Sequence, residues 1–326
     1  MSRRNESLSR PRRPAPQPTG AAVAAIVLLI GGGCGGDGRR SASAPPELAR
    51  APERASGAAS REIVFAHLSP GSRNAHLFVA RADGSRLRRI DRTDDEKQDP
   101  EVSPDGSKVA YRSLARGDYT DTPLLVLNVR TGRATSLTKR SRVRGFGPTW
   151  RPDGRMLAVA GKRARTDNEG LWLMRPDGSS ARRARLPRFE VQYPAWAPDG
   201  RSIAFTAVEQ KGFAIYTAAP DGTGLKRLTP LGGSANTPSW SPDGRQIAYG
   251  EGEAGIFVMN RDGSRKRRVR RDGGSPLTWA PGPSILYSCR RGARFATCGG
   301  LPDGSREELL GGLDSGFAAW RSDPRP

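Results

Sequence analysis

The chain has little of what hydrolytic or metal chemistry needs. Its 326 residues include two histidines, three cysteines and four methionines. A Ser-His-Asp triad requires a histidine, and zinc sites draw mainly on cysteine and histidine. Only His67 and His76 are present, at what we expect to be an ordinary loop, and no Gly-x-Ser-x-Gly nucleophile elbow occurs. We therefore expect a protein that is not an enzyme, with no catalytic residue, no metal and no cofactor.

Long apolar runs are also scarce, and the longest lies near the amino terminus. The run from Ala21 to Ile30 has ten residues, half of the roughly 20 that a membrane-spanning helix needs. It follows a basic stretch and ends in small residues before Cys34, the pattern of a signal peptide over 1-34. Cys34 resembles the acylated cysteine of a bacterial lipobox, although Gly31 stands where that motif prefers Leu. We predict lipidation at Cys34 and export to the cell envelope, with simple secretion as the alternative.

Residues 35-60 contain almost no bulky apolar side chain. Such a segment buries too little surface to offset its ordering entropy. We expect a disordered linker that tethers a folded domain to the membrane surface.

Acidic residues are in deficit. Asp and Glu number 33 against 54 Lys and Arg, and the formal net charge is +21. Arg outnumbers Lys 47 to 7, which either reflects genomic base composition or serves attraction to an anionic surface. The charge alone does not separate these two interpretations.

Proline and glycine are plentiful, with 27 and 40 residues, and they recur in one phrase, Pro-x-Trp-x-Pro-Asp-Gly. Full copies span 148–154, 194–200 and 238–244, a variant spans 100–106, and degenerate copies lie at 278–282 and 319–321. The Trp position of the phrase falls at residues 102, 150, 196, 240, 279 and 320, in steps of 48, 46, 44, 39 and 41. Six copies at this period indicate six structural units.

Each unit holds two tight turns with β-type runs between them. Pro-Asp-Gly combines a fixed φ, a side chain that bonds its own backbone and a residue that tolerates positive φ. A second turn, Asp-Gly or Thr-Gly, lies out of phase with the first, and its glycines are residues 84, 132, 178, 222, 263 and 304. Four antiparallel strands per unit, named A to D, form the blade of a propeller. The sequence thus predicts an all-β fold, a six-bladed β-propeller of four-stranded antiparallel blades over 61-322.

The first unit lacks a strand A, and the last phrase, from Phe317 to Trp320, is a strand A with nothing after it. Pairing the C-terminal strand with the first blade would close the ring. Closure removes exposed sheet edges, which invite aggregation.

The repeated phrase, followed by Ile-Ala-Phe or a similar run, resembles the repeat of TolB-like propellers, a WD-repeat-like family. The resemblance covers about residues 61–322 and implies a propeller in the bacterial cell envelope. That family also carries an amino-terminal α/β domain that we do not find in these residues, so we expect no role that depends on it.

The irregular connections predict where binding occurs. A-B and C-D turns emerge on one side of a blade, and the longer D-A and B-C connections emerge on the other. Loops of varied length on a regular scaffold are where recognition is usually built. We predict partner contacts on that side and at the mouth of a central channel. The candidate residues are Asp95, Asp99, Arg142, Arg144, Phe189, Tyr193, Asn236 and Asp272. The Trp of each phrase is interpreted as core between blades.

Two smaller features have alternative interpretations. The stretch from Asp91 to Asp99 is acidic, and we expect a solvated loop there, with a bound cation or basic partner as the alternative. The D strands are basic and outermost, which predicts either a solvated rim or adhesion to anionic lipid or wall polymer.

Cys289 and Cys298 remain as a pair on neighbouring strands if Cys34 is lipidated. We predict a disulfide between them, because export favours oxidation. Two free buried thiols are the alternative.

Three functions from different classes follow. The first is a monomeric scaffold that binds an envelope protein partner through the loop side while anchored at Cys34. The second is charge-driven binding of an anionic polymer or lipid, with nucleic acid disfavoured. The third is a small-ligand or enzymatic role in the central channel.

Overall fold

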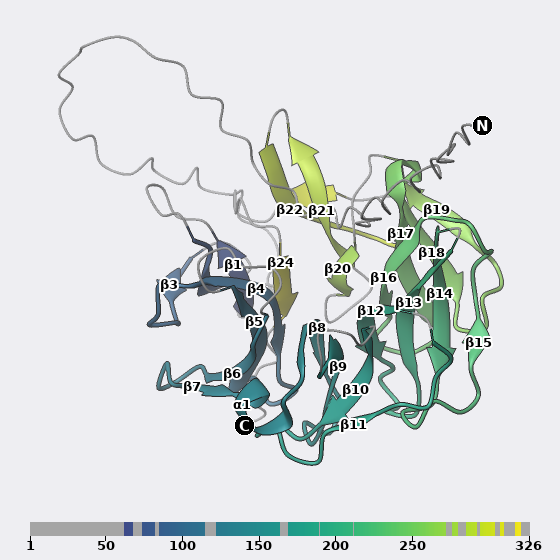
Figure 1. Ribbon diagram of the computed structural model, residues 1–326. Coiled ribbons are helices and arrows are strands. Elements are labelled where there is room, and N and C mark those ends of the chain that lie inside the picture. The colour runs from purple at the N-terminus through teal and green to yellow at the C-terminus, as the bar shows by residue number, and fades with distance from the viewer. Residues whose placement is uncertain are drawn as a thin grey trace, which may run out of the picture. The chain divides into compact units, whose positions relative to one another are not determined.

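A computed structural model describes residues 62–67, 74–81, 85–114, 122–163, 169–188, 190–210, 212–271, 276–279, 285–291, 294–303, 307–309 and 317–320. All of them lie in one compact unit, Leu48–Pro326. They form six four-stranded antiparallel sheets, which confirms the predicted six-bladed propeller (Figure 1). No helix among these residues has the length and apolar character to cross a bilayer.

Within every blade the strands pair in the order A, B, C, D. Blade 1 holds β24 (Phe317–Trp320), β1 (Glu62–His67), β2 (His76–Arg81) and β3 (Arg88–Arg89). Blade 2 holds β4 (Glu96–Val102), β5 (Lys108–Leu114), β6 (Leu124–Asn128) and β7 (Ala134–Ser136). Blade 3 holds β8 (Arg144–Trp150), β9 (Leu157–Lys162), β10 (Gly170–Met174) and β11 (Arg182–Arg183).

The remaining blades repeat this order. Blade 4 holds β12 (Glu190–Trp196), β13 (Ile203–Glu209), β14 (Gly212–Ala218) and β15 (Lys226–Arg227). Blade 5 holds β16 (Ala235–Trp240), β17 (Gln246–Glu251), β18 (Ile256–Asn260) and β19 (Arg267–Arg270). Blade 6 holds β20 (Pro276–Trp279), β21 (Ile285–Arg291), β22 (Arg294–Gly300) and β23 (Glu307–Leu309).

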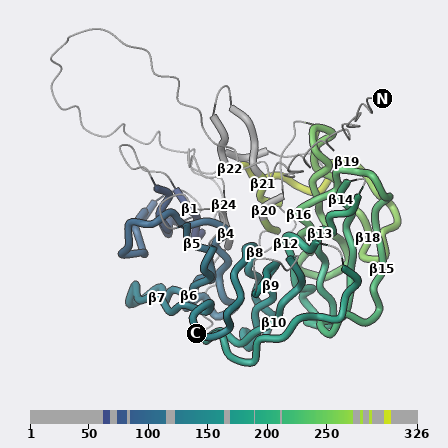
Figure 2. The backbone as a smooth tube through the Cα atoms, in the orientation of Figure 1, coloured from purple at the N-terminus to yellow at the C-terminus, as the bar shows by residue number. Residues whose placement is uncertain are grey.

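The A strands surround the propeller axis, and each contacts the A strand of the next blade. The tube in Figure 2 follows this succession from purple to yellow. The last strand belongs to the first sheet, where β24 pairs with β1 and Trp320 lies opposite Ile63. β24 also contacts β4 and β20, so first and last blades are neighbours.

The Pro-Asp-Gly turns form because of local bonds that the sequence dictates. In the A-B turns of blades 2 to 5 the Asp Oδ1 accepts the backbone N–H two residues on, for example Asp105 from Ser107 at 3.0 Å and Asp243 from Arg245 at 3.0 Å. The following glycine is left-handed, with φ of 70° at Gly106 and 67° at Gly244. This conformation is sterically strained for residues with a Cβ atom, but glycine adopts it without that energetic cost. These turns define the turn side of the propeller.

The loop side carries the B-C and D-A connections, and successive blades are hydrogen bonded there. Lys97 N–H donates to Ala75 O at 2.9 Å, Gly145 N–H to Thr122 O at 3.1 Å and Val191 N–H to Glu169 O at 2.9 Å. Each bond joins the start of the A strand of one blade to the B-C segment of the blade before it. The loop-side surface therefore rests on backbone that is fixed between blades.

The tryptophans of the phrase lie between blades, as interpreted from the sequence. Trp150, Trp196, Trp240 and Trp279 are 5–7% exposed. Each packs with residues of the preceding blade, as Trp240 does with Ala204 and Ile215. Apolar layers thus lie between successive blades from blade 1 to blade 6.

Two short helices were not predicted. α1 (Leu137–Ser141) follows β7, and the Ser136 side chain caps it by accepting the N–H of Lys139. The 3₁₀ turn η2 (Gly252–Ala254) joins β17 to β18. Serine caps are a common start signal, but a single turn is too short to show an apolar period.

Candidate loop-side binding site

The A strands share an irregularity at the residue before the first Pro of the phrase. The pairing of A with B shifts register there in blades 2 to 5. The residue is left-handed in all four blades, with φ of 52° at Asp99, 56° at Gly147, 45° at Tyr193 and 47° at Thr237. A bulge leaves a residue outside the strand ladder and redirects its side chain. Two predicted contacts, Asp99 and Tyr193, occupy this position.

Asp99 is held between blades 2 and 3. Its Oδ2 forms an ion pair with Arg112 Nε at 2.8 Å, although the angle is not that of a hydrogen bond. The same oxygen accepts the N–H of Gly147 at 3.2 Å. Arg112 also donates to Gln98. The carboxylate therefore joins two neighbouring bulges.

Two aromatic rings extend this contact to blade 4. The Arg112 guanidinium lies 5.7 Å from the centroid of the Phe146 ring. Phe146 meets Tyr193 edge to face, with centroids 5.6 Å apart and planes at 65°. Burial, together with the charge of Asp99, raises the pKa of Tyr193 to about 12, so its phenol stays protonated at neutral pH. We call Asp99, Arg112, Phe146 and Tyr193 the Arg112 cluster.

Blade 5 adds polar groups at the same level. Thr237 N–H donates to Thr206 Oγ1 at 3.1 Å, and Thr237 Oγ1 donates to the predicted contact Asn236 at 3.2 Å. In blade 4, Gln192 donates to Glu190 at 2.7 Å. The bulges of four blades thus present amide, hydroxyl, aromatic and guanidinium groups.

Glu101 is a carboxyl group of β4, three residues before the A-B turn. Its backbone carbonyl accepts the indole N–H of Trp150 at 3.0 Å. Burial raises the pKa of the Glu101 side chain to about 8, while its surface exposure is intermediate. It is therefore largely protonated at neutral pH and can donate a hydrogen bond.

The acidic stretch differs from the expected solvated loop. Asp91 is 6% exposed and Lys97 is fully buried, and Lys97 Nζ lies 3.1 Å from Asp91 Oδ2. Asp91 also accepts from Leu77 N–H at 2.9 Å and contacts His76 Nδ1 at 3.2 Å. His76 is thus part of a buried network, not an ordinary loop residue. The cation at this loop is the chain's own lysine ammonium.

Asp95, a predicted contact, belongs to the same network. Its Oδ1 lies 3.2 Å from Lys97 Nζ, and its Oδ2 accepts from Ser113. Burial would raise the pKa of Asp95, but the bonds and the nearby ammonium lower it instead. Both oxygens are engaged internally, so Asp95 is positioned by the fold before any partner arrives.

Arg142 and Arg144 are exposed on the loop side. Arg142 caps α1 in a left-handed conformation with φ of 62°, and Arg144 begins β8 opposite Pro123. The structure brings Asp99 and Tyr193 into one cluster and leaves these two arginines on the adjoining surface. Phe189, Asp272 and Cys34 lie outside the described residues.

Cys298 is buried and disulfide-bonded. The register places Cys289 opposite Ala296, two residues from Cys298. The side chain of Cys289 lies outside what the structure describes, so its pairing with Cys298 stays a prediction.

Arg112 and Phe146 were not predicted from the sequence. Phe146 stands two residues before the Pro of the phrase, so aligning the copies at the bulge would have shown it. Arg112 comes from a B strand, and nothing in the repeat marks it. No group of three or more His, Cys, Asp or Glu within the described ranges is arranged to hold a metal ion.

Six four-stranded blades with polar and aromatic side chains of several blades meeting on the loop side define a six-bladed propeller with a candidate binding surface. Residues 54–307 match the PD40 family, the TolB beta propeller domain. The chain belongs to this family.

Individual relatives match shorter stretches. The chain is 32% identical over 121 residues to the "Uncharacterized peptidase YuxL" of Bacillus subtilis, covering 36% of this chain and 18% of the peptidase. It is 31% identical over 146 residues to the "Protein TolB homolog" of Chlorobium luteolum, covering 44% of this chain and 31% of that protein. The chain thus matches less than a third of the length of either relative.

Solved structures show the same fold. TolB from Acinetobacter baumannii gives a TM-score of 0.66 at 21% identity, over 81% of this chain and 67% of that one. A putative TolB from Agrobacterium tumefaciens gives 0.60 at 20% identity, over 81% and 98%. At such identities the likeness concerns the fold alone.

Proposed function

We propose that the protein is a non-catalytic scaffold of the cell envelope that binds a protein partner through the loop side. The observation that carries this is the Arg112 cluster, to which blades 2, 3 and 4 contribute. Arginine and aromatic side chains tend to dominate interface energies. In this cluster they are held by an ion pair and a ring contact, so little ordering entropy remains to be lost on binding.

The amino-terminal sequence supports the envelope location. A signal peptide over 1-34, lipidation at Cys34 and a linker over 35-60 would tether the 61-322 propeller to a membrane surface. The similarity to the TolB homolog of Chlorobium luteolum supports the same assignment.

The test is a pull-down from detergent-solubilised membranes with the full chain, at low and high salt. We expect a partner that is retained at both salts, because the cluster buries its charges. The double variant Arg142→Asn and Arg144→Gln removes two exposed loop-side cations, and Asn tolerates the left-handed cap. We expect it to retain at least about tenfold less partner, the loss of about 1.4 kcal/mol of binding free energy.

Arg201→Gln with Arg245→Gln is the matched control. Both residues are exposed and follow Pro-Asp-Gly turns on the turn side, so net charge falls equally. This control should retain the partner as the wild type does. Equal losses in the two double variants would overturn the loop-side assignment.

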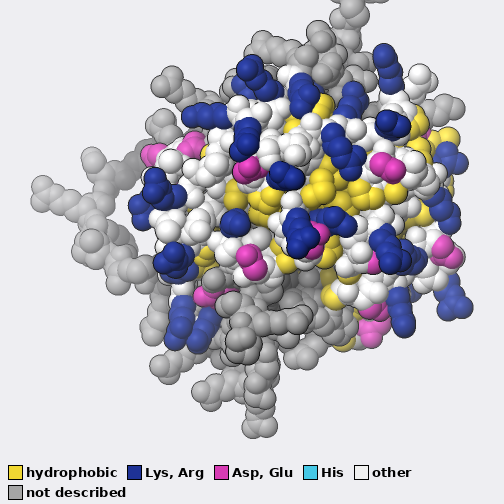
Figure 3. All heavy atoms as spheres, turned by 90° about the horizontal axis from the view of Figure 1, so that it is seen from below, with side chains coloured by type: hydrophobic (Ala, Val, Ile, Leu, Met, Phe, Trp, Pro, Cys, Tyr) yellow, Lys and Arg dark blue, Asp and Glu magenta, His cyan; other side chains and the backbone are white. Residues whose placement is uncertain are grey.

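Charge-driven binding of an anionic polymer or lipid is the second candidate. It is favoured by the D strands, whose exposed basic residues are Arg88, Arg89, Arg182, Arg183, Lys226, Arg227, Arg267 and Arg268. Figure 3 shows Lys and Arg spread over one face, where they outnumber the acidic side chains among them. For this function, retention in the same pull-down would fall steeply with salt.

A further inference from the structure

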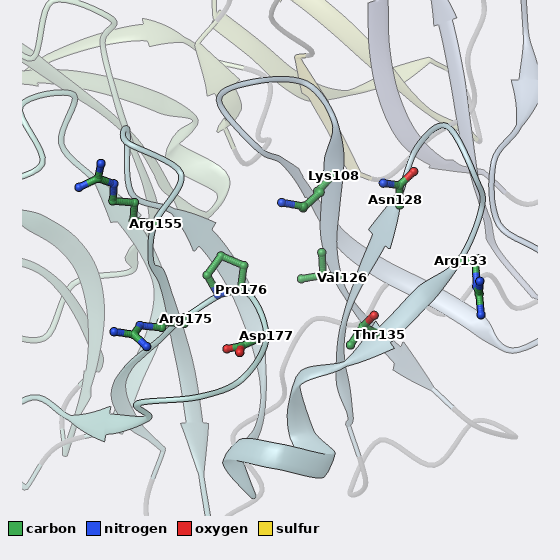
Figure 4. A pocket seen from close by; sticks show the side chains of 9 residues that line it. All are labelled: Lys108, Val126, Asn128, Arg133, Thr135, Arg155, Arg175, Pro176 and Asp177. Atoms are coloured by element: carbon green, nitrogen blue, oxygen red, sulfur yellow. The ribbon is translucent and has the colours of Figure 1, made fainter.

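A groove lies between blades 2 and 3 on the turn side, away from the Arg112 cluster. Its volume is about 640 Å³, within the usual range for ligand sites of about 300–1,000 Å³. Blade 2 contributes Lys108, Val126, Asn128, Arg133 and Thr135. Blade 3 contributes Arg155, Arg175, Pro176 and Asp177 from its two turns (Figure 4).

The groove is open because of one short side chain. In blades 3, 4 and 5 a basic D-strand residue reaches a carbonyl in the C-D turn of the next blade. Arg182 donates to Pro220 O at 3.4 Å, Lys226 to Asp262 O at 3.0 Å and Arg267 to Pro302 O. These residues lie opposite Leu173, Thr217 and Val258 of their C strands.

In blade 2 the equivalent position is Thr135, opposite Val126. Its hydroxyl is too short to cross to blade 3. The carbonyl at the position of Pro220 O and Pro302 O is Pro176 O, which accepts no hydrogen bond from any described residue. The missing bridge therefore leaves both a gap and an unused acceptor.

The groove carries an excess of positive charge. Lys108, Arg133, Arg155 and Arg175 form neither a salt bridge nor a side-chain hydrogen bond with any described residue. The one carboxylate, Asp177, is bound to Arg140 at 2.7 Å and accepts from Ser179 at 2.6 Å. These bonds, that of Ser179 first, lower the pKa of Asp177, so it stays ionised and already paired.

The walls between these charges are partly apolar. Figure 4 shows Val126 and Pro176 on opposite walls, with Arg155 and Arg175 to one side and Arg133 to the other. The Asn128 Oδ1 is used inside its own turn, where it accepts from Arg130 N–H at 3.1 Å and Thr131 N–H at 2.9 Å. Its amide NH₂ has no partner among the described residues and can donate to a ligand.

We propose that this groove binds an extended acidic peptide segment of a protein partner. Carboxylates would pair with the four cations, a small aliphatic side chain would contact Val126 and Pro176, and a peptide N–H would donate to Pro176 O. A phosphate polymer offers acceptors alone at neutral pH, so it leaves that carbonyl unused and gains nothing from the apolar walls. The chemistry therefore favours a peptide.

The variant Thr135→Arg tests the proposal, because it introduces the bridging side chain that blades 3, 4 and 5 have. The probe is a fluorescein-labelled peptide, Asp-Glu-Leu-Asp-Glu, titrated with the full chain and followed by polarisation. We expect binding to the wild type and at least tenfold weaker binding to Thr135→Arg, although that variant gains a positive charge. Thr135→Val, which keeps the groove open, should bind within about twofold of the wild type.

Equal or tighter binding to Thr135→Arg would show that surface charge alone attracts the peptide, and the groove proposal would fail. Inorganic polyphosphate serves as a competing probe. If polyphosphate binds the wild type and binds Thr135→Arg more weakly, while the peptide does not bind, the ligand is a phosphate polymer and the peptide assignment is wrong. Unchanged melting temperatures of both variants show that they are folded.

A second variant removes positive charge from the groove and leaves it unfilled. Arg155→Gln with Arg175→Gln should weaken peptide binding at least tenfold, whereas Arg201→Gln with Arg245→Gln should leave it unchanged. The groove lies on the other side from the proposed partner surface. Arg142→Asn with Arg144→Gln should bind the peptide as the wild type does, so failure of either proposal is separable from failure of the other.

Discussion

At the scale of single residues, the tryptophans of the phrase tie neighbouring blades by packing and, in three cases, by a hydrogen bond. The indole N–H of Trp240 donates to Ala195 O at 3.1 Å, and Trp150 and Trp279 bond the preceding A strand in the same way. Trp196 has the same burial but its Nε1 has no partner among the described residues. A comparison of Trp240, which makes the bond, with Trp196, which does not, therefore distinguishes the effect of packing from that of hydrogen bonding.

We predict that Trp240→Phe destabilises the fold more than Trp196→Phe. Both substitutions remove the same atoms, and both indoles lie 5.8 Å from an arginine guanidinium. The difference in unfolding free energy should be about 1 kcal/mol, the net contribution of one hydrogen bond. Urea denaturation of the two variants measures it. Equal losses of unfolding free energy in the two variants would mean that the indole hydrogen bond does not stabilise the fold beyond what packing contributes.

The roles of these tryptophans could be predicted from sequence because a fixed place in every repeat implies a shared structural task. Arg112 and Lys97 could not be assigned in this way. Their partners lie in another blade or in a folded loop, and no repeat position marks them. Contacts between side chains of different blades depend on which residues the closed ring brings together. The spacing of the repeats does not show which residues these are.

At the scale of elements, the D-A segment from Ile90 to Lys97 is held by charge. Burial would raise the pKa of Asp91, but bonds from Arg89 and Lys97 outweigh it and lower the pKa below its ordinary value of 3.8. Asp91 therefore stabilises the fold fully above that value, and this contribution is lost as pH falls through the lowered pKa. The loop is an acid-sensitive connection between blades 1 and 2.

We predict that Lys97→Met destabilises the protein by about 3–5 kcal/mol, because it leaves a buried carboxylate without its ammonium partner. The acid limb of the stability curve should also move to higher pH. Chemical denaturation at pH 7 and between about pH 3 and 5 measures both effects. Adding Asp91→Asn to Lys97→Met should recover part of the loss. A single variant as stable as the wild type would mean that the ion pair is not net stabilising.

The strands and turns of the blades were predictable, since Pro-Asp-Gly and the second glycine turn recur in nearly every unit. The bulge in the A strands of blades 2 to 5 was not predicted, although the same left-handed residue precedes Pro in these four blades. Residues before proline usually avoid helical φ and ψ. A residue before proline is expected to be extended, so the sequence does not reveal the left-handed conformation that the surrounding sheet imposes there.

At the scale of the whole molecule, the ring includes strands from both ends of the described chain. β24 pairs with β1 over four residue pairs, from Ile63–Trp320 to Ala66–Phe317. Without β24, the inner edge of blade 1 would present unpaired backbone groups, and exposed edges promote association between chains.

We predict that deleting residues 310–326 lowers the melting temperature by about 10 °C or more, since a domain of this size loses about 2–4 °C for each kcal/mol. The truncated protein should also self-associate. Calorimetry and sedimentation velocity measure the two effects. Deleting 321–326 alone is the control, because it keeps β24. A fully stable, monomeric 310–326 deletion would show that β24 is dispensable for the ring.

Thr135 has a consequence for how such rings acquire ligands. Three other blades seal the seam beside them with one cationic side chain, and blade 2 leaves its seam open with a hydroxyl. A change of a single codon can therefore expose or conceal a recognition slot while the blades themselves stay intact. Family members that share every turn and tryptophan can in this way differ in which seam, if any, is available to a partner.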